Sequence, residues 1–300
     1  MLSILIPNYN QNVIELVNQL NYQVKENACQ AEIIVGDDAS ENSVFELNRV
    51  IEQISEVRVI RHNTQLGRAR MRNVLADEAK FDNLLFIDSD ALLLNTKFIK
   101  NYLNLVHDAK VIIGGVAYQK KEPKNNALLL RWKYGRKKEE RFASERNLNP
   151  YKSFSTFNFF IEKKTFQSIR FNETLMDYGH EDTLFGYELQ KRNIPVLHID
   201  NALLHNGLEE GSVFLEKTRI SLASLHYLYQ ELNFDAAFRE QVRILDTAYN
   251  LNKFGLVPIA KLKFQIFRNY LEKNLTGRSP SVLFFQMYKL GYYCTIADRI

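Results

Sequence analysis

Short apolar runs alternate with segments of helical length through residues 1–116 of the chain. The runs are four to six residues long and consist mostly of Val, Ile and Leu, a pattern that predicts buried strands. Buried strands joined by helical crossovers predict a parallel sheet covered on both faces, and right-handed crossovers make it a doubly wound α/β fold. The predicted strands are Leu2–Ile6, Glu32–Gly36, Val57–Ile60, Leu84–Ile87 and Val111–Val116, and the predicted helices are Val13–Lys25, Val44–Ile54, Gly67–Lys80 and Thr96–Val106.

This alternation ends after Val116. A basic run, Arg131–Arg141, then predicts either a long mobile loop of the kind that forms lids or the charged end of a solvated helix. We expect an α/β domain with a mostly parallel sheet over residues 1–211 and a C-terminal helical extension over residues 212–300. The other predicted elements are strands at Ser155–Glu162, Ile194–His198 and Ala202–His205, and a helix from Tyr178 to Arg192.

The composition is that of an ordinary globular protein. Of the 300 residues, 46% are apolar and 25% are charged, which excludes intrinsic disorder and low-complexity architecture as descriptions of the chain. Cys29 and Cys294 give neither a disulfide framework nor a spaced metal cluster, as expected in a reducing compartment. The sequence shows no secretory leader and no run of about 18–20 apolar residues, so we expect a cytoplasmic protein.

The C-terminal region differs from the rest of the chain in charge. Residues 212–300 hold twelve Lys or Arg against seven Asp or Glu, whereas residues 1–211 are nearly balanced. A basic amphipathic helix in this region predicts either peripheral contact with the inner face of the plasma membrane or packing on the α/β domain or a second subunit. No nucleic-acid motif accompanies the charge. The apolar face comprises Ile259, Leu262, Ile266 and Tyr270, with Lys261 and Arg268 opposite.

Polar side chains follow each of the first four predicted strands. Because the carboxyl ends of neighbouring parallel strands meet at one edge of the sheet, we expect these residues to converge on one rim, where ligands of such sheets bind. The alternative is that they are helix caps and turns, since Asp, Asn and Ser are common in both. The four segments are Asn8-Tyr9-Asn10, Asp37-Asp38-Ala39-Ser40, Asn63-Thr64-Gln65-Leu66-Gly67 and Asp88-Ser89-Asp90.

The fourth of these segments predicts metal chemistry. Asp88 and Asp90 are two positions apart in extended chain, so both carboxylates point to the same side. Mg²⁺ and Mn²⁺ prefer oxygen ligands and bind beside substrate phosphates, so the pair predicts a metal–diphosphate site. The glycine-rich fingerprints of dinucleotide-binding folds and of P-loop kinases do not follow any predicted strand, which disfavours both classes.

The segment Asn63–Asn73 predicts a loop that leads into a helix. Gly67 allows close backbone approach, and a helix N-terminus favours an anion. Arg68, Arg70 and Arg72 add positive charge, but alternate positions of a helix diverge, so only one or two of these arginines are expected to face a ligand.

Taken in order, these segments resemble the motifs of the inverting family-2 glycosyltransferases, which have the GT-A fold of nucleotide-diphospho-sugar transferases. The resemblance covers about residues 1–210, and its one departure is a wider spacing between Asn63 and Gly67 than in the family pattern. The five matching elements are Ile4–Asn10, Val35–Ser40, Asn63–Asn73, Asp88-Ser89-Asp90 and Glu181-Asp182.

This resemblance implies a metal-dependent enzyme that moves a hexosyl or N-acetylhexosaminyl group from a nucleotide sugar, commonly a UDP-sugar, to a hydroxyl acceptor. It also implies a bacterial setting in polysaccharide or glycoconjugate synthesis, with a glycan or lipid-linked acceptor. Asp38 is expected near the uracil or ribose, and Asp90 is expected to hold the Mn²⁺ or Mg²⁺ ion more directly than Asp88. The expected donor-binding residues are Pro7, Asn10, Asp37, Asp38, Asn63, Gly67, Arg70, Asp88 and Ser89.

Transfer with inversion needs one general base, which takes the proton of the acceptor hydroxyl. We assign this role to Asp182, in the first turn of a predicted helix behind Gly179, where partial desolvation favours a raised carboxyl pKa. Glu181 is expected to orient the acceptor or the donor sugar. The alternative for both acidic residues is that they stabilise the helix N-terminus through its dipole.

A histidine completes the expected metal site. The resemblance implies a histidine ligand near His205, and an imidazole suits Mn²⁺ better than Mg²⁺. His198 is the competing candidate, although it falls within a strand pattern. The alternative for His205 is a partly buried residue with a structural partner.

Two other functions compete with sugar transfer. A sugar nucleotidyltransferase is expected to carry a Gly-rich basic loop after its first strand, and Pro7-Asn8-Tyr9-Asn10 is not such a loop. A non-catalytic nucleotide-sugar-binding scaffold subunit would not need Asp88, Asp90 and Asp182, which are all present.

Overall fold

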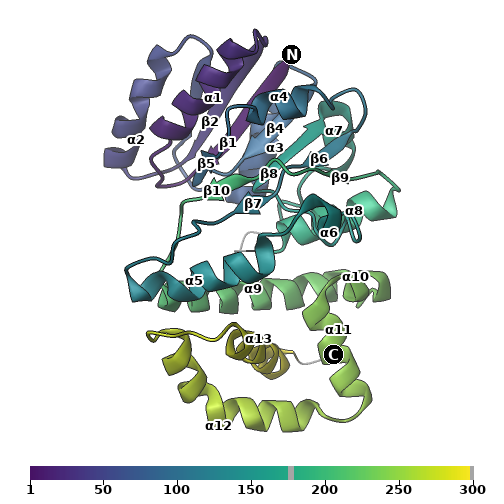
Figure 1. Cartoon of the computed structure of the whole chain (residues 1–300). Coiled ribbons are helices and arrows are strands. Elements are labelled where there is room, and N and C mark those ends of the chain that lie inside the picture. Colours follow the sequence, from purple (N-terminus) through teal and green to yellow (C-terminus); the bar gives the residue numbers. More distant parts are fainter. Residues whose placement is uncertain (175–178, 298–300) are drawn as a thin grey trace. The chain divides into compact units, whose positions relative to one another are not determined.

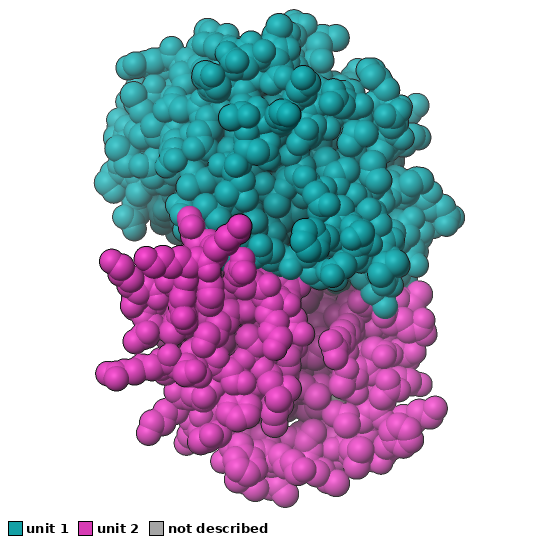
Figure 2. Space-filling model, viewed as in Figure 1, with its two compact units in different colours: residues 1–118, 140–176, 181–207 teal, residues 119–139, 177–180, 208–300 magenta. Residues whose placement is uncertain are grey.

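The structure is a computed structural model that describes residues 1–174 and 179–297 (Figure 1). Its chain forms two compact units (Figure 2). The predicted boundary after residue 211 stays a prediction, but residues 119–139 group with the C-terminal helices, which their position in the sequence did not suggest. Unit 1 comprises residues 1–118, 140–176 and 181–207, and unit 2 comprises residues 119–139, 177–180 and 208–300.

A mostly parallel sheet forms the centre of unit 1, as the apolar runs predict. Within the described residues it has seven strands in the order β3-β2-β1-β4-β8-β6-β9. Strand β8 runs antiparallel to both of its neighbours, and the other pairs are parallel. The strands are β1 (Leu2–Asn8), β2 (Ala31–Asp38), β3 (Val57–His62), β4 (Asn83–Ile87), β6 (Val111–Ile113), β8 (Asn158–Glu162) and β9 (Leu197–His198).

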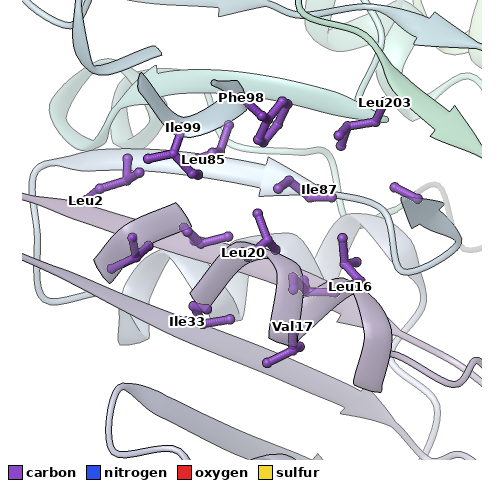
Figure 3. Close-up of a cluster of buried hydrophobic side chains, with 14 of the residues drawn as sticks. Leu2, Leu16, Val17, Leu20, Ile33, Leu85, Ile87, Phe98, Ile99 and Leu203 are labelled. Atoms are coloured by element: carbon purple, nitrogen blue, oxygen red, sulfur yellow. The ribbon is translucent and has the colours of Figure 1, made fainter. Parts of the chain in front are cut away.

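Helices cover both faces of this sheet because the strands are apolar on both sides. In β1, Ile4 and Ile6 pack in one hydrophobic core with α1 and α4, whereas Leu5 packs in the other core with α3, α7 and α8. Figure 3 shows Leu16 and Leu20 of α1 lying in the first core. The doubly wound fold is therefore confirmed. The helices are α1 (Ile14–Glu26), α2 (Asn42–Asn48), η1 (Arg49–Gln53), α3 (Arg68–Glu78), α4 (Phe98–Leu103), α6 (Ala143–Arg146), α7 (Lys163–Ile169) and α8 (Glu181–Lys191).

One predicted strand, Val111–Val116, is wrong as a single element. It divides into β6 in the large sheet and β7 (Val116–Ala117) in a small sheet of order β5-β10-β7, with β5 (Ala91–Leu93) and β10 (Leu203–His205). The division falls at Gly114 and Gly115, where Gly115 has a φ of 94°. The carbonyl oxygens of Ile113 and Gly114 accept hydrogen bonds from Arg146 and from the backbone N–H groups of Ile199 and Asn201. Those oxygens mark the point where the chain leaves the large sheet.

Unit 2 is helical. The basic run, which the sequence left as a mobile loop or a helix end, forms α5 (Leu129–Tyr134) and a turn of π-helix, η3 (Gly135–Glu139), held by an ion pair between Arg131 and Glu139. Leu130, Phe264 and Tyr288 contribute to its apolar core. The other helices are η2 (Asn126–Leu128), α9 (Gly211–Glu231), α10 (Ala236–Gln241), α11 (Arg243–Lys253), α12 (Val257–Leu275) and α13 (Val282–Ile296). Over the described chain, every helix falls short of the length and hydrophobicity that crossing a membrane requires.

Candidate active site

The carboxyl ends of the parallel strands of unit 1 lie at one edge of the large sheet. In the register of the strands, Asn8 of β1 pairs with Asp37 of β2, and Asp38 of β2 pairs with His62 of β3. Strand β4 runs parallel to β1 on its other side and leads into Asp88. The polar segments that follow these strands therefore lie along one rim, which we call the rim below.

On this rim, Asn10 links the loops that follow β1 and β2. It adopts a positive φ of 55°, a conformation that Asn tolerates better than most residues. Its backbone N–H donates to the hydroxyl of Ser40 at 2.9 Å, and its side-chain oxygen accepts from the N–H of Glu41 at 2.8 Å. Pro7 lies one residue before the end of β1, opposite Gly36 of β2.

The two aspartates at the end of β2 are buried and hold neighbouring loops. Asp38 accepts hydrogen bonds from the backbone N–H groups of Leu66 at 2.6 Å and Gly67 at 3.0 Å, and Asp37 accepts from the N–H of Ser40 at 3.1 Å. The N-cap of α2 is Glu41, so neither carboxylate caps that helix, whereas the bond of Asp37 to the N–H of Ser40 is the turn role that was also an alternative. Asp38 thus fixes the loop before α3, where Gly67 has a φ of 83°.

A buried arginine, and not the expected Arg70, joins the two acidic motifs. The guanidinium of Arg72 donates to Asp88 Oδ1 at 2.7 Å and to Glu181 Oε1 at 3.2 Å. Arg70, the predicted donor-binding arginine, is exposed and pairs instead with Glu173 at 3.7 Å. Two positions along a helix correspond to about 200°, so these two arginines point to opposite sides of α3. Arg72 therefore bonds directly to both acidic motifs, which Arg70 does not.

The first turn of α8 carries two acidic residues whose pKa values are shifted in opposite directions. Burial raises the pKa of Glu181, but the charges of Arg72 and Arg68 outweigh it, so this pKa lies below its ordinary value. Burial and the neighbouring charge of Glu181 raise the pKa of Asp182 to about 6. The N–H of Thr183 donates to Asp182 Oδ1 at 2.7 Å and fixes that carboxylate. Near neutral pH, Asp182 is thus an ionised carboxylate with increased basicity.

Asp90 and His205 come together through the register of the small sheet. His205 pairs with Ala91, so Asp90 lies one position away, and the N–H of Asn206 donates to the Asp90 carbonyl oxygen at 2.8 Å. His205 Nε2 lies 3.5 Å from Asp90 Oδ2. The imidazole stacks between the rings of Tyr118 and Phe157, with centroid distances of 5.3 and 5.5 Å. The fold therefore holds the predicted histidine beside the predicted metal ligand.

A glycine makes room for the Asp90 carboxylate. A Cβ atom at position 207 would lie 2.4 Å from Asp90 Oδ2, closer than side chains approach one another. Gly207 follows β10 by two residues and passes directly over this carboxylate. The absence of a side chain at position 207 thus keeps Asp90 beside His205.

The donor atoms at this site suit a cation that shares its ligands with a substrate. Among the described residues there is no group of three His, Cys, Asp or Glu side chains that could hold a metal ion. Asp88 instead pairs with Arg72, which leaves a carboxylate and an imidazole side by side at Asp90 and His205. One carboxylate plus phosphate oxygens is a common ligand set for Mg²⁺, and an imidazole adds affinity for Mn²⁺. The pair fits such an ion.

The remaining predicted residues are also located. Asn63 is exposed in the loop between β3 and α3, and Ser89 is half-buried between Asp88 and Asp90. His198 is buried, where Arg146 donates to its Nδ1 at 2.7 Å and its Nε2 bonds to the Pro150 carbonyl oxygen at 2.9 Å. Burial lowers the pKa of His198 to about 4, so it is a neutral residue of the core. The first residue of the predicted helix, Tyr178, lies outside the described residues.

A model of the family "Glycosyl transferase family 2" matches residues 3–166, more than half of the chain. The chain belongs to glycosyl transferase family 2. The resemblance seen in the motifs is therefore confirmed. The matched range includes the ends of β1 to β4 and hence most of the rim, whereas Glu181, Asp182 and His205 lie beyond it.

Relatives of this glycosyltransferase include bacterial proteins. An uncharacterized glycosyltransferase of Haemophilus influenzae is 42% identical over 94 residues, and the chondroitin synthase of Escherichia coli is 25% identical over 243 residues. These matches span 30% and 70% of this chain but only 29% and 35% of those proteins. A second uncharacterized glycosyltransferase of Haemophilus influenzae is 23% identical, over 83% of this chain and 92% of that protein.

Solved structures share the fold of this glycosyltransferase at low identity. The mannosyltransferase PcManGT of Pyrobaculum calidifontis, in complex with GDP-Man and Mn²⁺, is 12% identical, with a TM-score of 0.57 over 99% of this chain and 85% of that one. TarS 1–349 of S. aureus is 18% identical, with a TM-score of 0.52 over 99% of this chain and 90% of that one. TarS 1–349 has also been solved in complex with UDP and with UDP-GlcNAc. These likenesses establish the GT-A fold of the chain.

Proposed function

We propose that this glycosyltransferase moves a hexosyl or N-acetylhexosaminyl group from a UDP-sugar to a hydroxyl of a glycan or lipid-linked acceptor, with inversion and with a divalent cation. Family membership supports sugar transfer, and the complexes of PcManGT and TarS with nucleotide sugars support a donor of this class. The match to part of a chondroitin synthase supports a role in bacterial polysaccharide or glycoconjugate synthesis.

The observation that carries the proposal is the bridge made by Arg72. One buried guanidinium holds Asp88, which follows β4, and Glu181, at the start of α8, so two motifs that are 93 residues apart along the chain meet at one point. Asp90 lies two residues after Asp88, and Asp182 directly follows Glu181. Arg72 therefore holds together the segment with Asp90, proposed to act on the leaving diphosphate, and the segment with Asp182, proposed to act on the attacking hydroxyl.

The donor is proposed to lie along the rim. Its nucleoside would contact the loops that Asn10 and Asp38 hold, and its diphosphate would lie towards Asp88-Ser89-Asp90 and the N-terminus of α3. Backbone N–H groups at a helix N-terminus favour an anion there. Arg68 is exposed in that first turn. Burial raises the pKa of Asp88 above its ordinary value, and the positive charges of Arg72 and Arg68 only partly offset this rise. Arg68 therefore adds positive charge where the diphosphate would lie.

In the proposed reaction, Asp182 takes the proton of the acceptor hydroxyl as that oxygen forms a bond to the anomeric carbon. The bond from the anomeric carbon to the diphosphate oxygen breaks, and the nucleoside diphosphate leaves on the opposite side, so the configuration inverts. Burial gives Asp182 its increased basicity, and Glu181, held by Arg72, keeps the turn in place. A bound divalent cation, held by Asp90 and His205, would neutralise charge on the departing diphosphate.

A donor panel tests this proposal. Thermal unfolding is measured with UDP-, GDP- and CMP-sugars, each with Mn²⁺, with Mg²⁺ or with EDTA. We expect UDP-sugars with Mn²⁺ to raise Tm by roughly 4–8 °C at a ligand concentration about 100 times Kd, because binding to the native state alone stabilises it. We expect Asp90→Asn to lose the metal-dependent part of that shift. No shift with any nucleotide sugar in either metal would contradict the proposal.

A further inference from the structure

Helix α12 of unit 2 has two apolar faces, and one of them is open. Phe264, Leu271 and Leu275 point into the core of the unit. Figure 1 shows α12 running alongside α13 at one edge of this helical group. The second apolar set lies on the other side of the helix, and its members are between 50% and 64% exposed: Ile259, Leu262, Ile266, Phe267 and Tyr270. These five residues are the open face of α12.

The open face is the one that the sequence pattern singles out. The repeat Ile259, Leu262, Ile266 and Tyr270 is the predicted apolar face. The core residues of α12 are different ones, and of the open face Tyr270 also contacts α13, with its ring centroid 5.9 Å from that of Phe284. Phe254, in the turn before α12, is also exposed. Contiguous apolar surface of this kind marks an interaction site in soluble proteins.

The charges on and beside this face have a single sign. At 100° per residue, Lys263 and Lys273 fall among the apolar residues of the open face, and both are exposed. Lys253 and Arg278, before and after the helix, are also exposed. The one acidic residue of α12 is Glu272, which falls outside this face and accepts hydrogen bonds from Arg219, Arg268 and Tyr288. The open face is therefore apolar with positive charges interspersed in it and at both of its ends.

We propose that the open face of α12 binds the surface of an anionic lipid bilayer. The helix would lie in the plane of the interface, with Leu262 and Ile266 among the acyl chains and Lys263 and Lys273 at the level of the lipid phosphates. An amphipathic helix with an apolar stripe and basic flanks binds membranes in this way, by buried apolar area together with attraction to anionic lipids. At about 28 Å, this 19-residue helix is long enough to lie across several lipid headgroups.

Charge complementarity favours a lipid surface over a second copy of the chain. A symmetric dimer through this face would bring the lysines of one copy towards those of the other, because an isologous interface pairs a surface with itself. Like charges at close range oppose such an interface. An anionic bilayer instead offers phosphates to every lysine of the face.

Vesicle flotation with the whole protein tests the proposal. The vesicles are phosphatidylcholine alone, or phosphatidylcholine with one third phosphatidylglycerol, at low ionic strength and again at high ionic strength. We expect binding to the anionic vesicles, weakened by salt, and little binding to the neutral ones. This readout does not depend on sugar transfer, so a failed donor panel and a failed flotation assay are distinguishable.

Matched variants distinguish binding through the open face from nonspecific binding due to the net charge or to exposed apolar residues elsewhere. We expect the pair Leu262→Glu and Ile266→Glu, and separately the pair Lys263→Glu and Lys273→Glu, to lower the partition coefficient at least about tenfold. The controls lie in unit 1: Leu47→Glu, where the leucine is 51% exposed, and the pair Lys100→Glu and Lys164→Glu, where both lysines are exposed. All of these sites are exposed, so the variants are expected to keep the wild-type Tm.

Three results would overturn the proposal. The first is no flotation with anionic vesicles. The second is flotation that the α12 variants leave unchanged or that the controls reduce equally. The third is that the wild-type protein does not bind vesicles but forms a dimer in light scattering, and that the Ile266→Glu substitution dissociates this dimer.

Discussion

A buried guanidinium sets the positions of the acidic side chains in the proposed active site. Arg72 bonds to both Asp88 and Glu181, and its side chain has almost no contact with solvent. Removing one partner of such a buried arrangement leaves uncompensated charge and typically costs about 3–5 kcal/mol. The planar guanidinium of arginine presents several N–H donors in fixed directions and can bond to two carboxylates at once. The ammonium group of lysine does this less well.

For Arg72, this leads to a specific expectation. Arg72→Lys keeps the charge but loses the fork, so we expect kcat/KM to fall at least about tenfold and the free energy of unfolding to fall by about 2–4 kcal/mol. Turnover assays and urea unfolding measure the two effects. Arg70→Lys is the matched control, because the exposed pair of Arg70 with Glu173 is expected to contribute little. Equal behaviour of the two variants would show that the Arg72 bridge does not matter.

The choice between these arginines also shows what the sequence alone can decide. Arg68, Arg70 and Arg72 alternate, so their charge gives no indication of which one faces the sheet. Arg72 lies three residues after Ala69 and three before Leu75, both of which are buried, so it belongs to the apolar stripe of α3. That periodicity was a usable signal for Arg72. Its partner Glu181, 109 residues away, could not be found from local pattern.

The raised pKa of Asp182 makes a second prediction, about stability. Its carboxyl binds a proton more tightly in the folded chain, with a pKa of about 6, than in the unfolded chain, with its ordinary value of 3.8. Below pH 3.8 the Asp182 carboxyl is protonated in both states, so it does not lower the free energy of unfolding. As the pH rises from 3.8 to 6, ionisation of Asp182 lowers the free energy of unfolding progressively, and above pH 6 the loss is complete. We expect Asp182→Asn to stabilise the protein by roughly 1–3 kcal/mol at neutral pH, with the gain disappearing near pH 4.

Urea unfolding of wild type and Asp182→Asn across this pH range measures the difference. Asn keeps a side-chain oxygen for the N–H of Thr183, so the helix turn is expected to stay intact. A variant that is less stable than wild type at neutral pH would mean that the carboxylate is not penalised by burial.

At the scale of elements, the pairing of β10 with β5 builds the proposed cation site. His205 pairs with Ala91, so the imidazole and the Asp90 carboxylate meet wherever this register forms. The sequence indicated both residues, because one follows a buried strand and the other ends a short apolar run. Their proximity depends on a pairing between segments more than 100 residues apart, which local periodicity does not report.

Gly207 gives this arrangement a direct test. In Gly207→Ala the new Cβ would lie 2.4 Å from Asp90 Oδ2, so the carboxylate must move away from His205. We expect the Mn²⁺ concentration for half-maximal turnover to rise about tenfold or more, while nucleotide binding in EDTA stays as in wild type. Asn206→Ala is the matched control, since Asn206 contacts Asp90 through its backbone N–H. Equal metal dependence in both variants would contradict the assignment.

Strand prediction worked where apolar runs end at a polar loop and failed where they do not. The β1 and β4 predictions agree with the structure to within two residues at each end. The run Val111–Val116 contains Gly114 and Gly115, and the chain leaves the large sheet at these glycines, where Gly115 has a φ of 94°. Glycine inside a strand pattern often marks a bend or bulge, so this pair was a usable signal for the division.

At the scale of the whole molecule, the sequence predicted the class of the fold and its family better than its division into parts. The alternation of strands and helices was enough for a doubly wound sheet, because both of its faces are apolar. The grouping of residues 119–139 with the C-terminal helices was not visible, because it depends on contacts such as that of Lys289 with Tyr134. The basic run predicts charge on a surface, but in the structure it is helical, buries Leu130 and carries the Arg131–Glu139 pair.

The central claim is that Asp182 is the base of a sugar transfer whose donor lies on the rim. Its most direct test is the release of UDP from the UDP-sugar that the donor panel selects, in Mn²⁺, by wild type and Asp182→Asn, with donor affinity measured by calorimetry. The assay contains no glycan and uses water as the acceptor, so the natural acceptor does not have to be identified first. We predict that release falls about 10²–10⁴-fold in the variant while the donor Kd is unchanged. Release at the wild-type rate, or loss of donor binding in the variant, would contradict the claim.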